Sequence, residues 1–123
     1  MRQVCLRLDN IGKVFSGGSL RKEEKTLFSG INLEVRQGET LGIMGESGSG
    51  KTTLGKIMAG LERPTSGSVI YKGKDIYRMD KKEWRVSRSK VQMLFQDPEG
   101  SLNPAKTIER SIRDVIKLAG YAQ

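Results

Sequence analysis

The chain has 123 residues, enough for one small domain with a modest core, and its 36% hydrophobic and 29% charged residues are typical of a soluble globular protein. No run approaches the roughly 18 apolar residues of a membrane span, and the N-terminal residues lack the long apolar core of a signal peptide. There is no histidine, which excludes histidine catalysis and histidine metal ligation within the chain, and the single cysteine, Cys5, cannot form an internal disulfide, so a cytosolic location is the default expectation.

Alternating apolar residues predict two strands at the start of the chain. The first covers residues 4–8 and the second covers residues 27–35. Residues 16–25 between them are rich in glycine, serine and charge without periodicity, which predicts a surface loop. A short apolar strand is expected at residues 41–44, directly before a glycine-rich stretch.

The glycine-rich stretch, residues 45–52, has two glycines five positions apart followed by lysine and threonine, which is the phosphate-binding loop pattern. Gly45, Gly48 and Gly50 should allow backbone conformations that turn consecutive N–H groups inward as a nest for phosphate, and the following helix adds its positive end. Lys51 can reach the β- and γ-phosphates, and Thr52 offers a hydroxyl to Mg²⁺. The alternative is a glycine-rich turn with a chance lysine, and the strand before and helix after favour the phosphate loop.

The residues after this loop predict a helix followed by a strand. Apolar residues at positions 54, 57, 58 and 61 predict a helix with one buried face, which should end at Gly60. Residues 64–67 predict a turn and residues 68–71 a strand that Gly73 breaks, with a short continuation beginning at Ile76.

The last part of the chain predicts a short helix around residues 81–88, a buried strand at residues 91–95 and a long loop at residues 97–104. An amphipathic helix with Thr107 near its start should follow, because apolar residues recur at positions 108, 112, 115, 116 and 119.

The formal charge is +8, from 22 basic and 14 acidic residues, and the excess is concentrated between positions 72 and 90. Such a cluster can indicate nucleic acid or an anionic membrane surface as a partner. We favour a solvated face of the short helix, since few aromatic residues are available to stack on bases. The basic residues are Lys72, Lys74, Arg78, Lys81, Lys82, Arg85, Arg88 and Lys90, against the acids Asp75, Asp80 and Glu83.

Several of these segments resemble ABC-type ATPases. Residues 45–54 resemble the first nucleotide motif of that family, and residues 59–61 and 64–69 resemble the link from its helix to its antiparallel sheet. Residues 95–98 (Phe-Gln-Asp-Pro) with residues 101–104 (Ser-Leu-Asn-Pro) are more specific, because they resemble the extended glutamine loop of the branch that energises oligopeptide, dipeptide and nickel import. The resemblance runs from about position 4 to the end of the sequence.

The resemblance implies roles for individual residues. Phe15 would stack on the adenine ring, and Gln96 would contact Mg²⁺ and the attacking water. Lys51 and Gln96 are thus the implied catalytic residues, and Thr52 and Gln96 the implied metal ligands. The residues implied to bind ATP are Phe15, Gly45, Glu46, Ser47, Gly48, Ser49, Gly50, Lys51, Thr52 and Thr53.

The implied fold class is α/β, with a P-loop NTPase core and an N-terminal antiparallel β subdomain. Residues 1–106 would form these parts, and residues 107–123 would begin a helical subdomain. The family's later signature sequence, catalytic acidic strand and switch histidine do not occur in the 123 residues. We therefore expect the front half of a nucleotide-binding domain, which alone would bind nucleotide weakly and show no turnover.

The implied function is ATP hydrolysis that drives import of a peptide or nickel-type solute. The implied partners are a second ABC-type ATPase subunit, in a homo- or heterodimer, and integral-membrane permease subunits at the cytoplasmic face of the cell membrane. Two alternatives remain: a nucleotide-binding fragment without its own turnover, and a soluble ABC-type ATPase acting on nucleic acid or ribosomes. The extended loop at residues 96–104 argues against the latter, so no nucleic acid partner is expected. The sequence does not decide between peptide and nickel.

Overall fold

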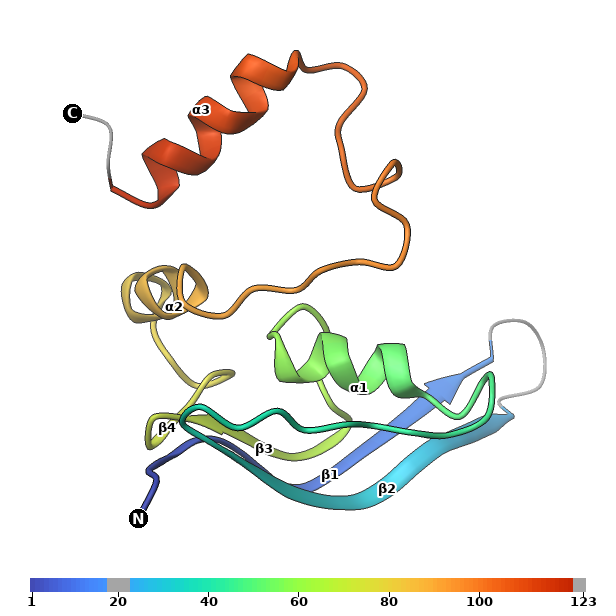
Figure 1. The fold of residues 1–123 in the computed structure, drawn as a ribbon. Coiled ribbons are helices and arrows are strands. Elements are labelled where there is room, and N and C mark those ends of the chain that lie inside the picture. The colour runs from blue at the N-terminus through green and yellow to red at the C-terminus, as the bar shows by residue number, and fades with distance from the viewer. Residues whose placement is uncertain (18–22, 121–123) are drawn as a thin grey trace.

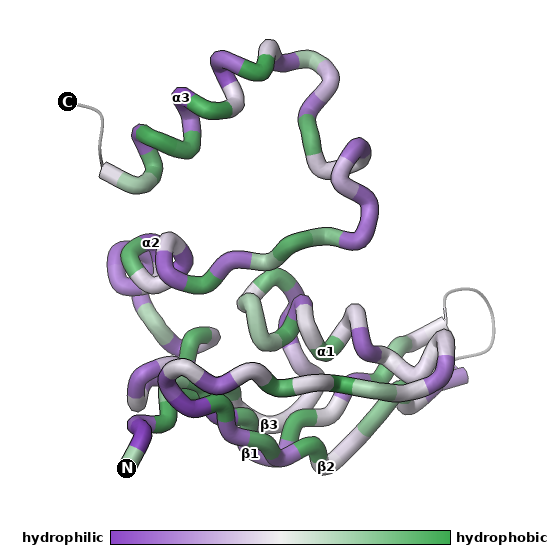
Figure 2. The backbone as a smooth tube through the Cα atoms, viewed as in Figure 1, coloured by the Kyte–Doolittle hydropathy of each residue, from purple (hydrophilic) through white to green (hydrophobic). Residues whose placement is uncertain are grey.

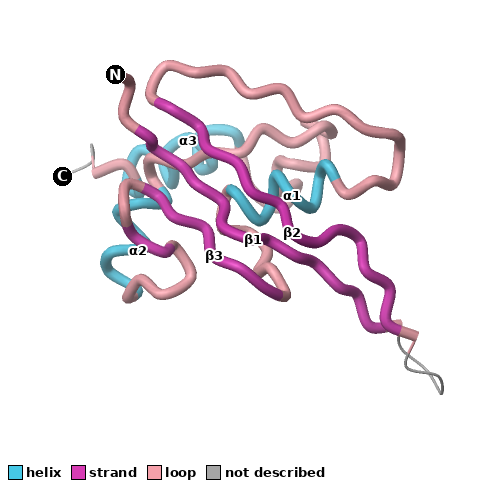
Figure 3. The backbone as a smooth tube through the Cα atoms, turned by 90° about the horizontal axis from the view of Figure 1, so that it is seen from below, coloured by secondary structure: helices cyan, strands magenta, loops and turns pink. Residues whose placement is uncertain are grey.

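The computed structural model of the protein describes residues 1–17 and 23–120. It contains an antiparallel sheet with the strand order β2-β1-β3-β4 (Figure 1). The strands are β1 (Val4–Ser16), β2 (Glu24–Arg36), β3 (Ser66–Tyr71) and β4 (Lys74–Asp75). Within this part of the chain, the helices α1 (Lys51–Met58), α2 (Lys81–Arg88) and α3 (Ile108–Leu118) lie on one side of the sheet (Figures 1 and 3).

The two N-terminal strands form a hairpin that is longer than the sequence predicts. Strand β1 continues to Ser16 and β2 begins at Glu24, so both extend into the predicted loop at residues 16–25. Phe15 pairs with Lys25 near the far end of this hairpin. Residues 18–22 of the predicted loop lie outside the described residues.

A bulge at Asn10 sets the direction of the side chains in β1. Leu8 pairs with Leu33 and Ile11 with Ile31, so β1 carries one residue more than β2 between these pairs. Asn10 takes the extra position with a left-handed φ of 52°, and its N–H donates to the Asn32 side chain at 2.8 Å. As a result, Leu8 and Ile11 both point into the core although they are three residues apart.

The core lies between α1 and the sheet. Leu54 and Ile57 form the buried face of α1, which the predicted periodicity gives correctly. The helix ends at Met58 before Gly60, whose φ is +71°, so Leu61 lies beyond the helix and is 40% exposed. The buried cluster consists of Leu8, Ile11, Leu54, Ile57, Val69 and Ile76.

The β3–β4 connection is a tight hairpin turn. Lys72 and Gly73 have φ values of 47° and 82°, and two consecutive positive φ angles match the twist of the flanking strands. Gly73 therefore breaks the strand as predicted, but the predicted start of the continuation at Ile76 is wrong, because β4 covers Lys74–Asp75. Ile76 follows β4 and is buried in the core.

Both predicted C-terminal helices form. At α2, the Asp80 carboxylate caps the first turn by accepting from the Glu83 N–H at 2.8 Å, and at α3 the Thr107 hydroxyl accepts from the Arg110 N–H at 3.2 Å. Figure 2 shows hydrophobic residues recurring along α3, which stands away from the sheet and buries none of them. Among the described residues, no helix combines the length and apolar character needed to cross a membrane.

Two predicted strands are wrong. Residues 41–44 and 91–95 are apolar but form no ladder with any described strand (Figure 3). Met44 and Leu94 are each 95% exposed. A buried parallel strand depends on hydrogen bonds to neighbouring strands, and no described strand pairs with either segment.

The Tyr77 side chain holds the C-terminal end of α1. Its hydroxyl lies 2.8 Å from the Ile57 carbonyl oxygen, which also accepts from the Gly60 N–H, and 2.5 Å from the Glu62 carbonyl oxygen beyond the helix. Its single O–H proton is therefore shared between these two acceptors. Burial raises the pKa of Tyr77 to about 12. The neutral hydroxyl is therefore the form that the folded chain stabilises.

We expect Tyr77→Phe to lower the free energy of unfolding by about 1–2 kcal/mol near pH 7, because the substitution removes this donor. The tyrosine pKa is raised on folding, so its stabilising contribution is complete below about pH 10 and is lost as pH rises toward about 12. The stability difference between the two chains, measured by urea unfolding from pH 8 to pH 11, should therefore shrink. Tyr71→Phe is the control, and an equal pH dependence in that variant would contradict the assignment.

Candidate functional site

A cleft of about 400 Å³ lies at the N-terminal end of α1. Its volume is in the range of small-molecule sites in proteins. The lining joins the end of β1, the glycine-rich loop and the segment after residue 95, which are far apart in sequence. The lining residues are Phe15, Leu27, Ser47, Gly48, Gly50, Lys51, Thr52, Thr53 and Gln96.

Apart from Gly45, Glu46 and Ser49, all eight residues predicted for the nucleotide site line this cleft. Those three residues do not line the cleft. They instead contact the Lys51 side chain, whose ammonium lies 2.5 Å from the Gly45 carbonyl oxygen, 2.7 Å from the Glu46 carbonyl oxygen and 3.4 Å from the Ser49 hydroxyl. The Lys51 side chain therefore folds back across the loop and ties its two ends together.

The loop leaves the first N–H groups of α1 open to the cleft. Gly50 is the N-terminal cap residue, with no side-chain cap, and the first turn of α1 carries no acidic side chain. Gly48 and Gly50 have left-handed φ values of 81° and 97°, which favour glycine. Open N–H groups at the positive end of a helix are suited to bind an anion.

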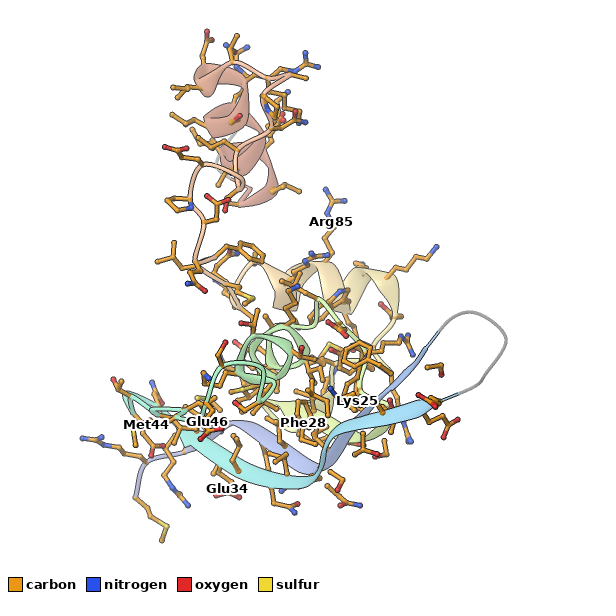
Figure 4. All side chains as sticks on the ribbon, turned by 90° about the vertical axis from the view of Figure 1, so that its right-hand side faces the viewer. Lys25, Phe28, Glu34, Met44, Glu46 and Arg85 are labelled. Carbon is orange, nitrogen blue, oxygen red and sulfur yellow. The ribbon has the colours of Figure 1, made fainter. Side chains whose placement is uncertain are left out.

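Close contact with β2 fixes the position of Gly50. A Cβ atom added to Gly50 would lie 2.8 Å from the Phe28 ring and 2.9 Å from a Leu27 methyl carbon. Phe28 lies on β2 beneath α1 (Figure 4). The loop backbone can therefore approach the sheet this closely only with glycine at this position.

Leu27 is a lining residue that the sequence did not predict. Lys13 pairs with Phe28 and Val14 with Thr26, so Leu27 is an extra residue on β2 between these two pairs. This bulge lets the adjacent residues Leu27 and Phe28 both approach Gly50. Simple alternation along the strand would place them on opposite faces, so the sequence carries no local signal for this contact.

The segment after Gln96 is ordered by its own side chains. The Asp97 carboxylate accepts from the N–H groups of Glu99 and Gly100, both at 3.1 Å, and the Ser101 hydroxyl donates to the Asp97 carbonyl at 2.7 Å. These bonds form a compact turn directly after Gln96. Gln96 therefore enters the cleft from the base of a structured loop.

The chemistry of two lining residues fits Mg²⁺. Thr52 and Gln96 present hydroxyl and amide oxygens to the same cleft, and Mg²⁺ commonly takes one or two protein oxygens together with phosphate oxygens. Residues 1–17 and 23–120 contain no group of three or more His, Cys, Asp or Glu side chains that could hold a metal alone.

Comparison with known proteins identifies chains similar to this one. The sequence profile described as ABC transporter matches residues 28–121. The oligopeptide transport ATP-binding protein AppF of Bacillus subtilis is 41% identical over 118 residues, covering 92% of this chain and 36% of AppF. The nickel import ATP-binding protein NikE of Brucella abortus is 36% identical over 111 residues, covering 89% of this chain and 42% of NikE. The chain thus spans about two fifths or less of the length of these relatives.

A solved structure shares the fold. The ATP-binding cassette MJ0796, a dimer in a post-hydrolysis state bound to ADP and Pi, superposes with a TM-score of 0.76 at 25% identity, covering 96% of this chain and 49% of that one. This likeness confirms the predicted fold class at the level of the antiparallel sheet subdomain with its associated helices.

We expect Gly50→Ala to lower the free energy of unfolding by about 2–4 kcal/mol, because the methyl group meets Phe28 and the backbone has a positive φ. Gly73→Ala is the matched control, since Gly73 has a φ of 82° but no atom within 4 Å of the added carbon. It should cost only about 1 kcal/mol. Chemical denaturation of the three chains measures both effects, and equal losses would show that contact with β2 does not fix Gly50.

Proposed function

This chain belongs to the ABC transporter family, and we propose that it binds ATP with Mg²⁺ as part of an ATPase that drives import of a peptide or nickel-type solute. The single observation that carries the proposal is the cleft that joins Phe15, the glycine-rich loop and Gln96. AppF and NikE, whose names specify oligopeptide and nickel transport, support the two solute classes.

Within this cleft, the phosphates would occupy the open N–H groups at the start of α1. The Lys51 ammonium now donates to the Gly45 and Glu46 carbonyls, and a bound phosphate would offer it stronger, charged acceptors. Lys51 would then turn from the loop to the β- and γ-phosphates. Phe15, at the other side of the cleft and 44% exposed, would offer its ring to the adenine base.

The proposed metal site consists of the Thr52 hydroxyl and the Gln96 amide oxygen. A bound Mg²⁺ would neutralise charge on the phosphate oxygens. Gln96 would also orient the attacking water, which makes Lys51 and Gln96 the proposed catalytic residues. Gly45, Glu46 and Ser49 would serve indirectly, by shaping the loop around Lys51.

The proposed assembly follows from the family. MJ0796 forms a dimer, and we propose that this protein likewise pairs with a second ABC-type ATPase subunit. Integral-membrane permease subunits would be its further partners, at the cytoplasmic face of the cell membrane. Residues 1–106 would contribute the nucleotide-binding core and β subdomain, and residues 107–123 the beginning of a helical subdomain. The alternative is nucleotide binding without turnover, which a phosphate-release assay distinguishes from hydrolysis.

A nucleic acid partner is the second alternative, and the structure gives it little support. The acids of the basic segment are engaged: Asp80 caps α2, Glu83 pairs with Lys74 at 2.5 Å, and Asp75 pairs with Arg78 at 3.4 Å. The cations on α2 are also exposed, as Figure 4 shows for Arg85. However, Trp84 packs against the core, so it cannot stack on bases.

We expect weak binding of this chain to single-stranded or duplex nucleic acid that disappears near physiological salt, because only phosphate contacts with surface lysines and arginines are available. Fluorescence anisotropy with a labelled oligonucleotide from about 20 to 200 mM salt measures this. Tight binding that survives at the upper salt concentration would support the nucleic acid alternative.

We expect Lys51→Ala to weaken Mg-ATP binding by about 10- to 100-fold, because it removes the only cationic side chain that the described residues contribute to the cleft lining. The fold should keep its stability, since the ammonium is exposed and contacts only the loop. Lys56→Ala, in the last turn of the same helix, is the control and should bind normally. Isothermal titration calorimetry on the three chains provides the test, and unchanged affinity in Lys51→Ala would remove the basis of the proposed function.

A further inference from the structure

Lys13 is a largely buried cation beside the candidate nucleotide site. Only 14% of its side chain is exposed, and it lies on β1 between Ile11 and Phe15. Its ammonium lies 2.9 Å from a carboxylate oxygen of Glu62 and donates to the Arg63 carbonyl oxygen at 2.9 Å. Two of the three N–H donors of the ammonium are thus occupied by protein acceptors. The Lys13 side chain is therefore fixed in position, unlike a freely moving surface lysine.

The same ammonium lies over the Phe15 ring, 5.1 Å from the ring centre. This distance is within the range of an attractive cation–π contact. Lys13 is absent from the residues that line the cleft, whereas Phe15 is among them. The ammonium therefore contacts the ring from outside the cleft and leaves it able to contact a ligand inside.

The segment that holds Lys13 is itself fixed to β1. The Thr65 N–H donates to the Gly12 carbonyl at 2.8 Å, and the Val14 N–H donates to the Thr65 hydroxyl at 2.9 Å. These bonds flank Lys13 on both sides along the strand. Glu62 and Arg63 are consequently held in place by backbone contacts that do not require Lys13.

Helix α1 connects these two regions. Its N-terminal end carries the phosphate loop, and the chain just beyond its C-terminal end carries Glu62, which holds Lys13. Tyr77 adds a further tie at that end, through the Ile57 and Glu62 carbonyls. One helix thus fixes both the place of the phosphates and, through Glu62 and Lys13, the place of the Phe15 ring.

We propose that Lys13 is a positioning residue for base recognition, which holds the Phe15 ring in the orientation that stacks on a purine. This inference rests on the proposed function. A positioning role for Lys13 can be distinguished from a purely structural role of the Lys13–Glu62 pair by which ligands lose affinity. A structural role would affect all ligands of the cleft, whereas a role through Phe15 affects only ligands that carry a base.

The test compares ATP with inorganic tripolyphosphate, which has the phosphates but no base. We expect Lys13→Met, which keeps the aliphatic stem and removes the charge, to weaken Mg-ATP binding by about two- to fivefold. Tripolyphosphate affinity should not change. Lys13→Arg, which retains the cation, should bind both ligands like the unsubstituted chain. Isothermal titration calorimetry measures all of these affinities.

A double substitution isolates the path through Phe15. Phe15→Ala alone should weaken ATP binding without affecting tripolyphosphate, and Lys13→Met should then cause no further loss. Equal losses for ATP and tripolyphosphate in Lys13→Met, additive losses in the double variant, or unchanged ATP affinity would each overturn the proposal. Failure of the unsubstituted chain to bind Mg-ATP would overturn the proposed function itself, and the role of Lys13 with it.

Discussion

The contact of the Gly50 backbone with Leu27 and Phe28 is the constraint on which the site depends. It places the start of α1 directly on β2, so the open N–H groups of the helix face the same cleft as the end of β1. No side chain fits between the two elements at this point. A change that moves the helix away from the sheet would therefore disturb the phosphate loop and the buried face of α1 together.

The core and the site share one side of the sheet. Leu54 and Ile57 anchor α1 against Ile11 and Val69, and the polar residues of the cleft continue the same layer beyond the helix N-terminus. Apolar side chains elsewhere remain in water, including Met44, Leu94 and those of α3. The stability of the described fold consequently rests on a small number of contacts around a single short helix. The hydrogen bonds of Tyr77 at the C-terminal end of that helix are therefore expected to contribute a substantial share of it.

How much of the fold and of the candidate site could be predicted depends on whether the determining contacts are local in sequence. Caps and periodicity predict the helices because Thr107, Gly60 and the spacing of apolar residues act within a few positions. The strands at residues 41–44 and 91–95 were predicted wrongly, because a buried strand requires neighbours that local sequence does not specify. The glycine-rich loop was recognisable from its pattern, whereas the proximity of Phe15 and Gln96 came only from the family resemblance. Leu27 and Lys13 were missed, since bulges determine which way their part of the hairpin faces.

The bulge at Asn10 has a consequence for how this strand tolerates change. The extra residue changes which alternate positions of β1 face the core. Even-numbered residues face the core before the bulge, and odd-numbered residues face the core and the cleft after it. Deletion of Asn10 would restore simple alternation and leave Ile11, Lys13 and Phe15 on the same face. Insertion of one further residue after the bulge, with regular pairing, would instead turn the second half of the strand over and place Phe15 on the solvent side, while every residue of the glycine-rich loop stayed the same. The ability to hold a base and the ability to hold phosphate are thus separable by one backbone position, and related sequences could lose or regain the former without any change in the phosphate loop.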